Sequence, residues 1–372
     1  MRKATKFWGL MLTVFLLIGL AACGDGGSTT SGTGNNASNN NSSGSGGGSS
    51  GGSSSGSAGN QGAGDDIQEL TIKISHVVAE NTPKHQGALA IKKYIEEASN
   101  GKIKVQVFPN SQLFGDNDEF QNLVANNVQF IIPDMAKLVG HDPGFNIPSM
   151  PFLFNSDKAA TDFWDGPKGQ EIFRRIESKG VVALYMWPNG PKHLTNNVRP
   201  IKSPEDMQGL KFRTQGGQVL EKVYSTLGAG SVSIPFGELY TALQQGTVDG
   251  QENTFSNIES RKFDEVQKYL TIMGHTRVDY VIMTNVKFWN SLNDATRKIV
   301  EEGVKKGTEV ARQEADSLNA EAFEKLKERG QIEIYTLSGE DIEKFRQALK
   351  PVYDEYNPII GEDVIQDAMS RQ

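Results

Sequence analysis

Hydrophobic and polar residues alternate along two short segments near the start of the folded part of the chain. Every second residue is apolar in LTIKISHV, residues 70–77, and again in KIKVQVF, residues 102–108, which is typical of strands. Between them, apolar residues recur at helical spacing over 88–98. Thr82 and Pro83 precede this stripe as a helix cap and first-turn proline. The pattern predicts a β-α-β unit.

The same order of strands and helices continues through the middle of the chain. Helices are expected near 117–125 and over 217–228. Strands are predicted at 128–132, 180–187, 209–214, 231–236 and 280–284. The segment PNGPKHLTN, residues 188–196, is rich in turn residues and follows Trp187. Alternating strands and helices predict an α/β sheet with ligands at the strand ends, and His76 and Asp134 lie just past two of those ends.

The segment GELYTALQQGTVDGQENTF, residues 237–255, combines a short helix with a polar cluster. The helix buries Leu239, Ala242 and Leu243 and is expected to end at Gly246. The four polar residues that follow predict a turn, which is either a solvated loop or the floor of a polar pocket; they are Asp249, Gln251, Glu252 and Asn253.

From Asp294 to Arg329 the pattern is helical almost without interruption. A helix of about 36 residues is roughly 54 Å long, which exceeds the width of one domain. We therefore expect it to lie across two lobes. A coiled-coil dimer is the alternative, but Gly303 and Gly307 stand where a zipper needs leucine. The apolar face consists of Val300, Val304, Ala311, Ala315, Leu318, Ala322 and Leu326.

Residues 1–22 have the pattern of a secretory signal. Basic residues precede a run of 14 apolar or small residues, FWGLMLTVFLLIGL, which is shorter than the roughly 20 residues that cross a bilayer. The run ends in LAAC, which looks like the lipobox of bacterial lipoproteins. Cys23, the single cysteine of the chain, would then be the lipidated first residue. The alternative is ordinary secretion, with Cys23 removed in the cleaved peptide.

Residues 24–64 contain 15 Gly, 12 Ser and 6 Asn among 41 residues. This composition cannot bury enough apolar surface to offset the entropy of ordering the chain. We expect residues 23–64 to form a lipidated, flexible tether, with a globular part beginning at residue 65.

Charge and motif content limit the function of that globular part. Once Arg2, Lys3 and Lys6 are set aside, 35 basic and 45 acidic residues remain, a net charge near −10. This balance argues against a nucleic-acid partner. GxSxG, HExxH, P-loop and GxGxxG motifs are absent from residues 65–372, and the five histidines lack metal-ligand spacing. We therefore expect no enzyme activity, no cofactor and no metal-ligand motif, while a Na⁺ or Ca²⁺ ion bound by Glu252 stays open; a hydrolase would need Asp134, Glu252 or His275 to meet in space.

Several longer segments resemble one protein family, the solute receptors of TRAP transporters of the DctP type. The similarity runs from about Leu70 to the C-terminus. The resemblance implies two lobes joined by hinge strands and a long helix spanning both, and a partner permease that runs on an ion gradient. It is carried by FPNSQLFGDNDEF, MPFLF, NGPKHLTNNVRPIKSPEDMQGLKFR, PFGELYTALQQGTVDGQEN and KFDEVQKYLTIMGH. On this basis, residues 65–189 and 279–318 are assigned to lobe I, and residues 190–278 and 319–372 to lobe II.

The resemblance also implies a set of ligand-binding residues. Arg213 in GLKFR matches the arginine that clamps a carboxylate, and Asn253 in DGQEN matches a ligand-facing amide. Phe236 resembles the ring that packs on the ligand, with Tyr240 a turn further on, and Asp134 matches an acidic contact. This chain has Lys192 where most of the family has a second arginine, and lysine cannot form the planar fork.

The class of ligand stays open between two organic acids. Asp134, with His76, Trp187 and His275 nearby, favours a hydroxylated monoacid such as a sugar acid. A C4-dicarboxylate is the alternative, with Lys192 as the second cation. We expect a monomeric, extracytoplasmic, lipid-anchored receptor; a ligand-binding component of a chemosensory system would use the same fold.

Overall fold

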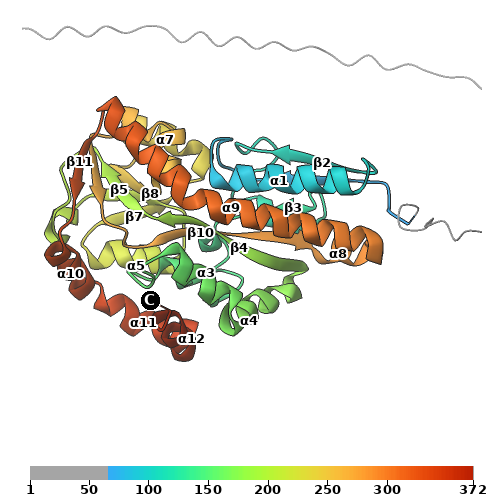
Figure 1. Cartoon of the computed structure of the whole chain (residues 1–372). Helices are drawn as coiled ribbons and strands as arrows, with labels where there is room; N and C mark the ends of the chain where they lie inside the picture. The colour runs from blue at the N-terminus through green and yellow to red at the C-terminus, as the bar shows by residue number, and fades with distance from the viewer. Residues whose placement is uncertain (1–65, 372) are drawn as a thin grey trace, which may run out of the picture. The chain divides into compact units, whose positions relative to one another are not determined.

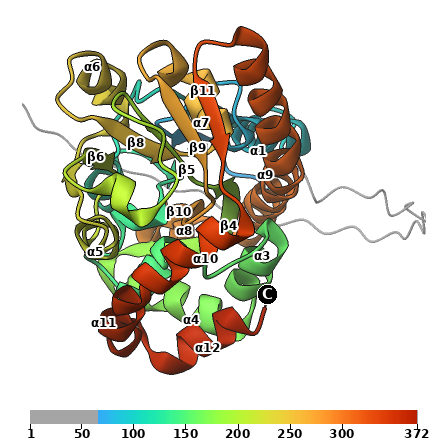
Figure 2. The ribbon, with the colours of Figure 1, turned by 90° about the vertical axis from the view of Figure 1, so that its left-hand side faces the viewer.

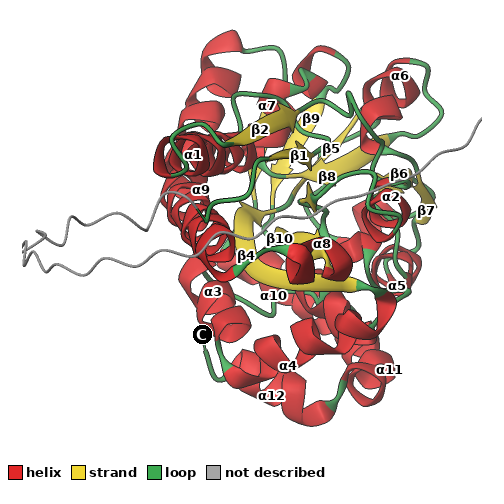
Figure 3. Ribbon diagram, turned by 90° about the vertical axis from the view of Figure 1, so that its right-hand side faces the viewer, coloured by secondary structure: helices red, strands yellow, loops and turns green. Residues whose placement is uncertain are grey.

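A computed structural model describes residues 66–371, and the strands in that part of the chain form two sheets (Figure 1). The predicted signal sequence, Cys23 and the tether lie outside the described residues. Figure 3 shows α1 (Pro83–Ala98) and α9 (Asp294–Arg329) on one side of the strands, and α2 (Glu119–Val124) and α5 (Gln218–Thr226) on the other.

The first sheet has the strand order β2-β1-β3-β10-β4. Its parallel part follows the predicted β-α-β unit, because β1 (Leu70–Ser75) pairs with β2 (Ile103–Phe108) and β3 (Phe130–Ile131). Strand β10 (Arg277–Asn285) runs antiparallel between β3 and the edge strand β4 (Val181–Pro191). Every residue of β10 is buried, so this strand forms the centre of the sheet's core.

The second sheet has the order β11-β9-β5-β8-β6-β7. Helices α5, α6 (Leu239–Gln244) and α7 (Phe255–Ser260) connect or follow its strands. The strands are β5 (His193–Asn196), β6 (Lys211–Thr214), β7 (Gly230–Ser233), β8 (Gly250–Asn253), β9 (Tyr269–Ile272) and β11 (Glu333–Thr336).

The chain passes between the sheets at adjacent places. Strand β4 continues into β5 through Lys192, and β9 continues into β10 through residues 273–276. The Lys192 amide donates to the Thr276 carbonyl at 2.8 Å, and the Gly274 amide donates to the Lys192 carbonyl at 3.1 Å. The two connections are therefore hydrogen-bonded to each other, and the predicted two-lobed α/β fold with paired hinge strands is confirmed.

Two predicted turns are strands in the structure. The expected turn at 188–196 is the end of β4 followed by β5. Prolines 188 and 191 are accommodated because β4 is an edge strand with a register shift that passes over Asn189, and Gly190 takes a φ of 107°. Proline is tolerated at sheet edges and bulges.

The polar turn expected after Val248 is the buried strand β8, which lies between β5 and β6. The polar side chains are compatible with a strand because they find partners inside the protein: Gln251 Nε2 donates to Thr195 Oγ1 at 3.0 Å. Gly250 makes the close packing possible, since a Cβ there would lie 2.1 Å from the Thr195 carbonyl oxygen.

Helix α9 has the predicted bounds and packs on α1, α7 and β4. Asn293 caps its start by accepting from the Thr296 amide, and Gly330 ends it with a φ of 60°. Its predicted apolar face is buried apart from Leu318, which is partly exposed. Elements of the same chain cover this face, so it is not available for the alternative coiled-coil dimer.

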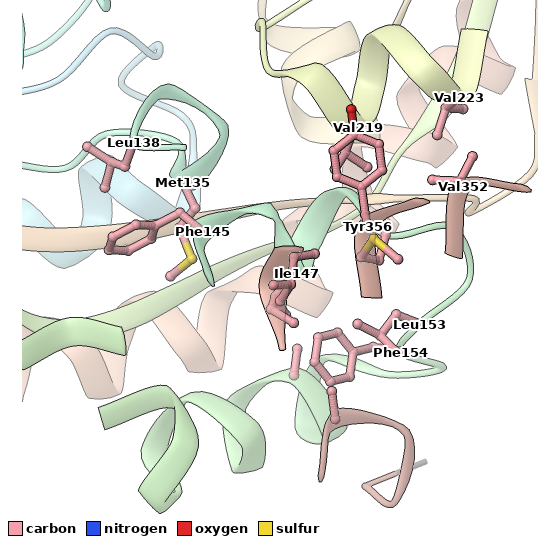
Figure 4. Close-up of a cluster of buried hydrophobic side chains, with 14 of the residues drawn as sticks. Met135, Leu138, Phe145, Ile147, Leu153, Phe154, Val219, Val223, Val352 and Tyr356 are labelled. Atoms are coloured by element: carbon pink, nitrogen blue, oxygen red, sulfur yellow. The ribbon is translucent and has the colours of Figure 1, made fainter. Parts of the chain in front are cut away.

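The C-terminal helices pack against helices and turns that follow strands of both sheets (Figure 2). Helix α11 (Lys350–Ile360) contacts α5 and the turns at Pro143–Ser149, and α12 (Glu362–Met369) contacts α3 (Asp157–Asp165). Figure 4 shows Val352 and Tyr356 of α11 beside Val219, Val223 and Ile147.

The boundaries of the two lobes that the resemblance implies stay a prediction. The remaining helices are α4 (Pro167–Arg175), α8 (Val286–Ser291) and α10 (Gly339–Ala348).

Close contact between α1 and α9 depends on glycine. A Cβ at Gly307 would lie 2.3 Å from Ile91 Cγ1 and 2.6 Å from the Gly87 carbonyl oxygen. We expect Gly307→Val to lower the free energy of unfolding by about 2 kcal/mol or more, because the helices must separate. Urea denaturation measures this. The matched control is Lys305→Val at an exposed position of α9, with a change below about 1 kcal/mol. Equal effects of the two variants would contradict the close-packing account.

Candidate ligand-binding site

A cavity lies where ends of strands from both sheets approach one another. The space between its walls is about 360 Å³, including its opening to solvent. Ligands of open α/β sheets bind at such strand ends. The lining residues are Val77, Val78, Lys84, Asp116, Glu119, Asp134, Arg213, Gln215, Phe236, Asn253, Asn257, Val278 and Tyr280.

Arg213 on β6 brings a buried positive charge to the cavity. Its exposed fraction is 0%. Its Nε donates to the Ile234 carbonyl at 2.9 Å, and the ring of Phe236 lies 5.8 Å from the guanidinium carbon. Both terminal nitrogens, Nη1 and Nη2, are without a hydrogen-bond partner among residues 66–371. Burial lowers the pKa of Arg213, but a guanidinium stays charged at neutral pH. The group is therefore a fixed fork that still needs an anion.

Amide side chains form a second wall. Asn253 Nδ2 donates to Gln251 Oε1 at 3.0 Å, and Asn257 Nδ2 donates to Asn253 Oδ1 at 2.8 Å. The Tyr280 hydroxyl lies 3.3 Å from Asn257 Nδ2. An amide nitrogen carries two hydrogens, so Asn253 retains one for a ligand while the network fixes its orientation.

Three acidic side chains also line the cavity, and each has a different setting. Asp116 Oδ2 accepts from the Phe236 amide and lies 3.2 Å from Lys137 Nζ. Asp134 accepts from the Ala136 amide at 2.8 Å and from Gln215 Nε2 at 3.2 Å; burial raises its pKa. Burial raises the pKa of Glu119 to about 8, so this carboxyl holds its proton at pH values where an ordinary glutamate has lost it.

Lys84 in the first turn of α1 is a cavity residue that the sequence reasoning missed. Its Nζ donates to the Ile132 carbonyl at 2.8 Å and lies 3.5 Å from the centre of the Tyr280 ring. Burial lowers its pKa to about 8. A lysine directly after Thr82 and Pro83, at the positive end of a helix, was the available signal. The other lining residues that were missed are Val77, Val78, Asp116, Glu119, Gln215, Asn257, Val278 and Tyr280.

Lys192 and His275 lie outside the lining and are paired with Glu252. Lys192 Nζ is 2.5 Å from Glu252 Oε1, and His275 Nε2 is 2.7 Å from Glu252 Oε2. Burial alone would raise the pKa of Glu252, but Lys192 and His275 together lower it. The carboxylate thus neutralises the lysine inside the protein, next to the connection between the sheets.

Three further predicted residues also lie away from the cavity lining. Trp187 Nε1 donates to Thr308 Oγ1 at 2.8 Å under α9. His76 Nε2 lies 3.1 Å from His85 Nδ1. The Tyr240 hydroxyl donates to Glu265 Oε2 at 3.3 Å on the surface. Of the predicted set, the cavity brings together Arg213, Asn253, Phe236 and Asp134.

Residues 66–371 hold no group of three or more His, Cys, Asp or Glu side chains arranged for a metal ion. Within the same residues, every helix is too short or too polar to cross a membrane.

Fold and cavity together define a class of two-lobed proteins that enclose a small solute. Residues 74–358 match the family model described as bacterial extracellular solute-binding protein, family 7, or DctP. The chain belongs to this family, as the resemblance in its motifs implied, and the family serves transport rather than catalysis.

Similar proteins cover almost the whole folded part. The C4-dicarboxylate-binding protein DctB of Bacillus subtilis (strain 168) is 37% identical over 310 residues, which are 82% of this chain and 89% of the relative. A TRAP periplasmic solute-binding protein from Shewanella oneidensis, solved with bound succinate, has a TM-score of 0.80 and 38% identity and covers 81% of this chain and 99% of its own.

A second solved structure binds a different kind of acid. The sugar acid binding protein DctPAm from Advenella mimigardefordensis strain DPN7T, in complex with galactonate, has a TM-score of 0.80 at 29% identity and covers 82% of this chain and 98% of its own. The same fold therefore accommodates dicarboxylates and sugar acids in different proteins.

The raised pKa of Glu119 predicts a pH-dependent stability. The folded state holds this proton up to about pH 8, whereas an unfolded glutamate releases it near pH 4.3. Stability from this group is thus present at low pH and lost as pH rises toward 8. Relative to Glu119→Gln, the ligand-free parent should lose up to about 1.4 kcal/mol per pH unit between pH 5 and 8. Urea denaturation at several pH values tests this; a constant difference between the two proteins would show that Glu119 is ionised in the fold.

Proposed function

We propose that this protein captures a C4-dicarboxylate outside the cell membrane and delivers it to a TRAP permease. The observation that carries the proposal is Arg213, a fully buried guanidinium whose Nη1 and Nη2 are both unpartnered within residues 66–371. A planar fork of this kind matches the two oxygens of a carboxylate with parallel hydrogen bonds. The ligands of similar proteins support the dicarboxylate class, since the Shewanella protein was solved with succinate and DctB is named as a C4-dicarboxylate-binding protein.

The cavity residues also favour a dicarboxylate over the sugar acid. The choice of a hydroxylated monoacid was based on Asp134 with His76, Trp187 and His275 nearby; Asp134 lines the cavity, but the other three lie outside the lining. A small diacid needs charged partners more than a row of hydroxyl acceptors. In the proposed complex, one carboxylate lies on Arg213, Asn253 supplies an amide donor, and Phe236 packs on the carbon chain. The ligand leaves the cavity chemically unchanged.

The N-terminal part of the chain supports an anchored receptor. The lipobox-like LAAC at Leu20–Cys23 follows a basic and apolar leader. In this proposal the leader is removed, Cys23 carries the lipid, and residues 24–64 give a monomeric receptor the reach to meet its permease. A flexible coil of this length spans roughly 35 Å.

Removing the guanidinium tests the proposed clamp. Truncating one member of a buried, hydrogen-bonded charge pair costs about 2–5 kcal/mol, so Arg213→Ala should weaken succinate binding by about 30-fold to several thousandfold. Arg213→Lys keeps the charge without the fork and should fall between the two. Calorimetry measures the affinities, with Arg174→Ala, an exposed arginine on α4, as the control. Parent-like affinity in a folded Arg213→Ala variant would rule out the clamp.

Replacing Cys23 tests the proposed anchor. Without its thiol the chain cannot accept a lipid, and a soluble domain lacks the apolar surface that holds it at a bilayer. Cys23→Ala should therefore move the protein from the membrane fraction to the soluble fraction, while purified protein keeps its ligand affinity. Fractionation of cells and calorimetry measure the two effects. Continued membrane association of the variant would argue for another mode of attachment.

A further inference from the structure

Lys84 is buried in the wall of the cavity although lysine is among the residues least often buried. Its exposed fraction is 1%. It stands in the first turn of α1, directly after the helix start at Pro83. A helix N-terminus carries a partial positive charge. A buried ammonium at this place therefore loses its hydration and is also repelled by the helix dipole. Such a position costs stability unless an anion joins it.

The contacts of Lys84 position its charge without neutralising it. The Ile132 carbonyl accepts one hydrogen bond at 2.8 Å, and the Tyr280 ring lies 3.5 Å from Nζ. A ring face and a carbonyl both attract an ammonium, but neither carries a full charge. Glu119, Asp134 and Asp116 lie near enough to raise the pKa of Lys84 against the effect of burial. No carboxylate of residues 66–371 forms an ion pair with it, whereas Lys137 pairs with Asp116 and Lys192 pairs with Glu252.

Glu119 lies in the same wall and complements this cation. Its Oε1 is 3.4 Å from the Ser75 hydroxyl, and its buried Oε2 has no hydrogen-bond partner in the described part of the chain. A protonated carboxyl is a donor as well as an acceptor. Because burial raises the pKa of Glu119 and its Oε2 is unpartnered, this side chain can donate to an anion bound at Lys84 instead of repelling it.

We propose that Lys84 binds the second carboxylate of the ligand, with Glu119 as a neutral donor beside it, and that Lys84 thereby makes the site selective for dicarboxylates over monocarboxylates. The proposal rests on the proposed function, in which Arg213 holds the first carboxylate. It gives the role of second cation to Lys84 rather than to Lys192, whose charge is already balanced by Glu252.

Succinate and succinamate are the probes that test the selectivity. Succinamate has the same heavy-atom skeleton, but a neutral amide replaces one carboxylate, so it can still place its remaining carboxylate on Arg213. The parent protein should bind succinate about 30-fold to several thousandfold more tightly than succinamate. Lys84→Met, of similar length without the charge, should lose most of this preference by weakening succinate binding. Calorimetry gives the four affinities.

Controls separate folding from binding. The ligand-free Lys84→Met variant should be at least as stable to heat as the parent, because it removes a buried, unpaired charge. Lys84→Gln keeps a polar side chain and serves in its place if the methionine variant fails to fold; it too should lose the preference.

The outcomes distinguish this inference from the function on which it rests. A folded Lys84→Met or Lys84→Gln variant that still prefers succinate to succinamate as strongly as the parent would overturn the role of Lys84. If in the same experiments the parent binds succinate and Arg213→Ala does not, the proposed function stands while the inference fails. If the parent binds neither probe, the proposed function fails and the inference with it.

Discussion

A guanidinium group that is removed from water must be paired, and in this protein Arg213 is buried while its fork is left open. The side chain projects from β6, an inner strand of the second sheet, and the hydrogen bond from Nε to the Ile234 carbonyl fixes its direction. Uncompensated burial of charge is expensive. In the proposed complex, a solute anion in the cavity at the strand ends supplies the missing partner and offsets this cost.

Buried charged side chains outside the cavity differ from those in the cavity in whether they form ion pairs. At the connections between the sheets, Lys192 and His275 both pair with Glu252 in a buried cluster. Further along β10, Arg277 is bound by Asp279 and Asp157. The cavity instead holds Arg213 and Lys84, neither of which forms an ion pair with a carboxylate of the described residues, although acidic side chains lie nearby. The buried charges outside the cavity are thus balanced by other side chains, whereas the charges of Arg213 and Lys84 remain available to a ligand.

Much of the fold could be predicted from the sequence, because periodic burial leaves a periodic pattern. Helix α9 has the bounds expected from its apolar stripe, and the β-α-β unit has the expected order. The prediction was wrong where polar residues are buried by their neighbours. Residues 250–253 were expected in a turn, since no single segment reveals that Thr195 and Gln267 continue their hydrogen-bond network.

The candidate site was predictable in part, and through the family motifs rather than through spacing. Arg213, Asn253, Phe236 and Asp134 line the cavity, as the resemblance implied, and their roles toward a ligand stay predictions. Lys84 was missed because a lysine in a first helical turn is ordinarily solvated. Its burial follows from contacts with Ile132 and Tyr280, about 50 and 200 residues away in the chain, which a local pattern cannot show.

A crystal structure of the protein grown with succinate tests the central claim most directly. The account predicts one carboxylate bound by both Nη1 and Nη2 of Arg213, at the roughly 2.7–2.9 Å typical of charge-assisted hydrogen bonds. Succinate bound elsewhere, or an Arg213 fork turned away from it onto Asp116 or Asp134, would contradict the account.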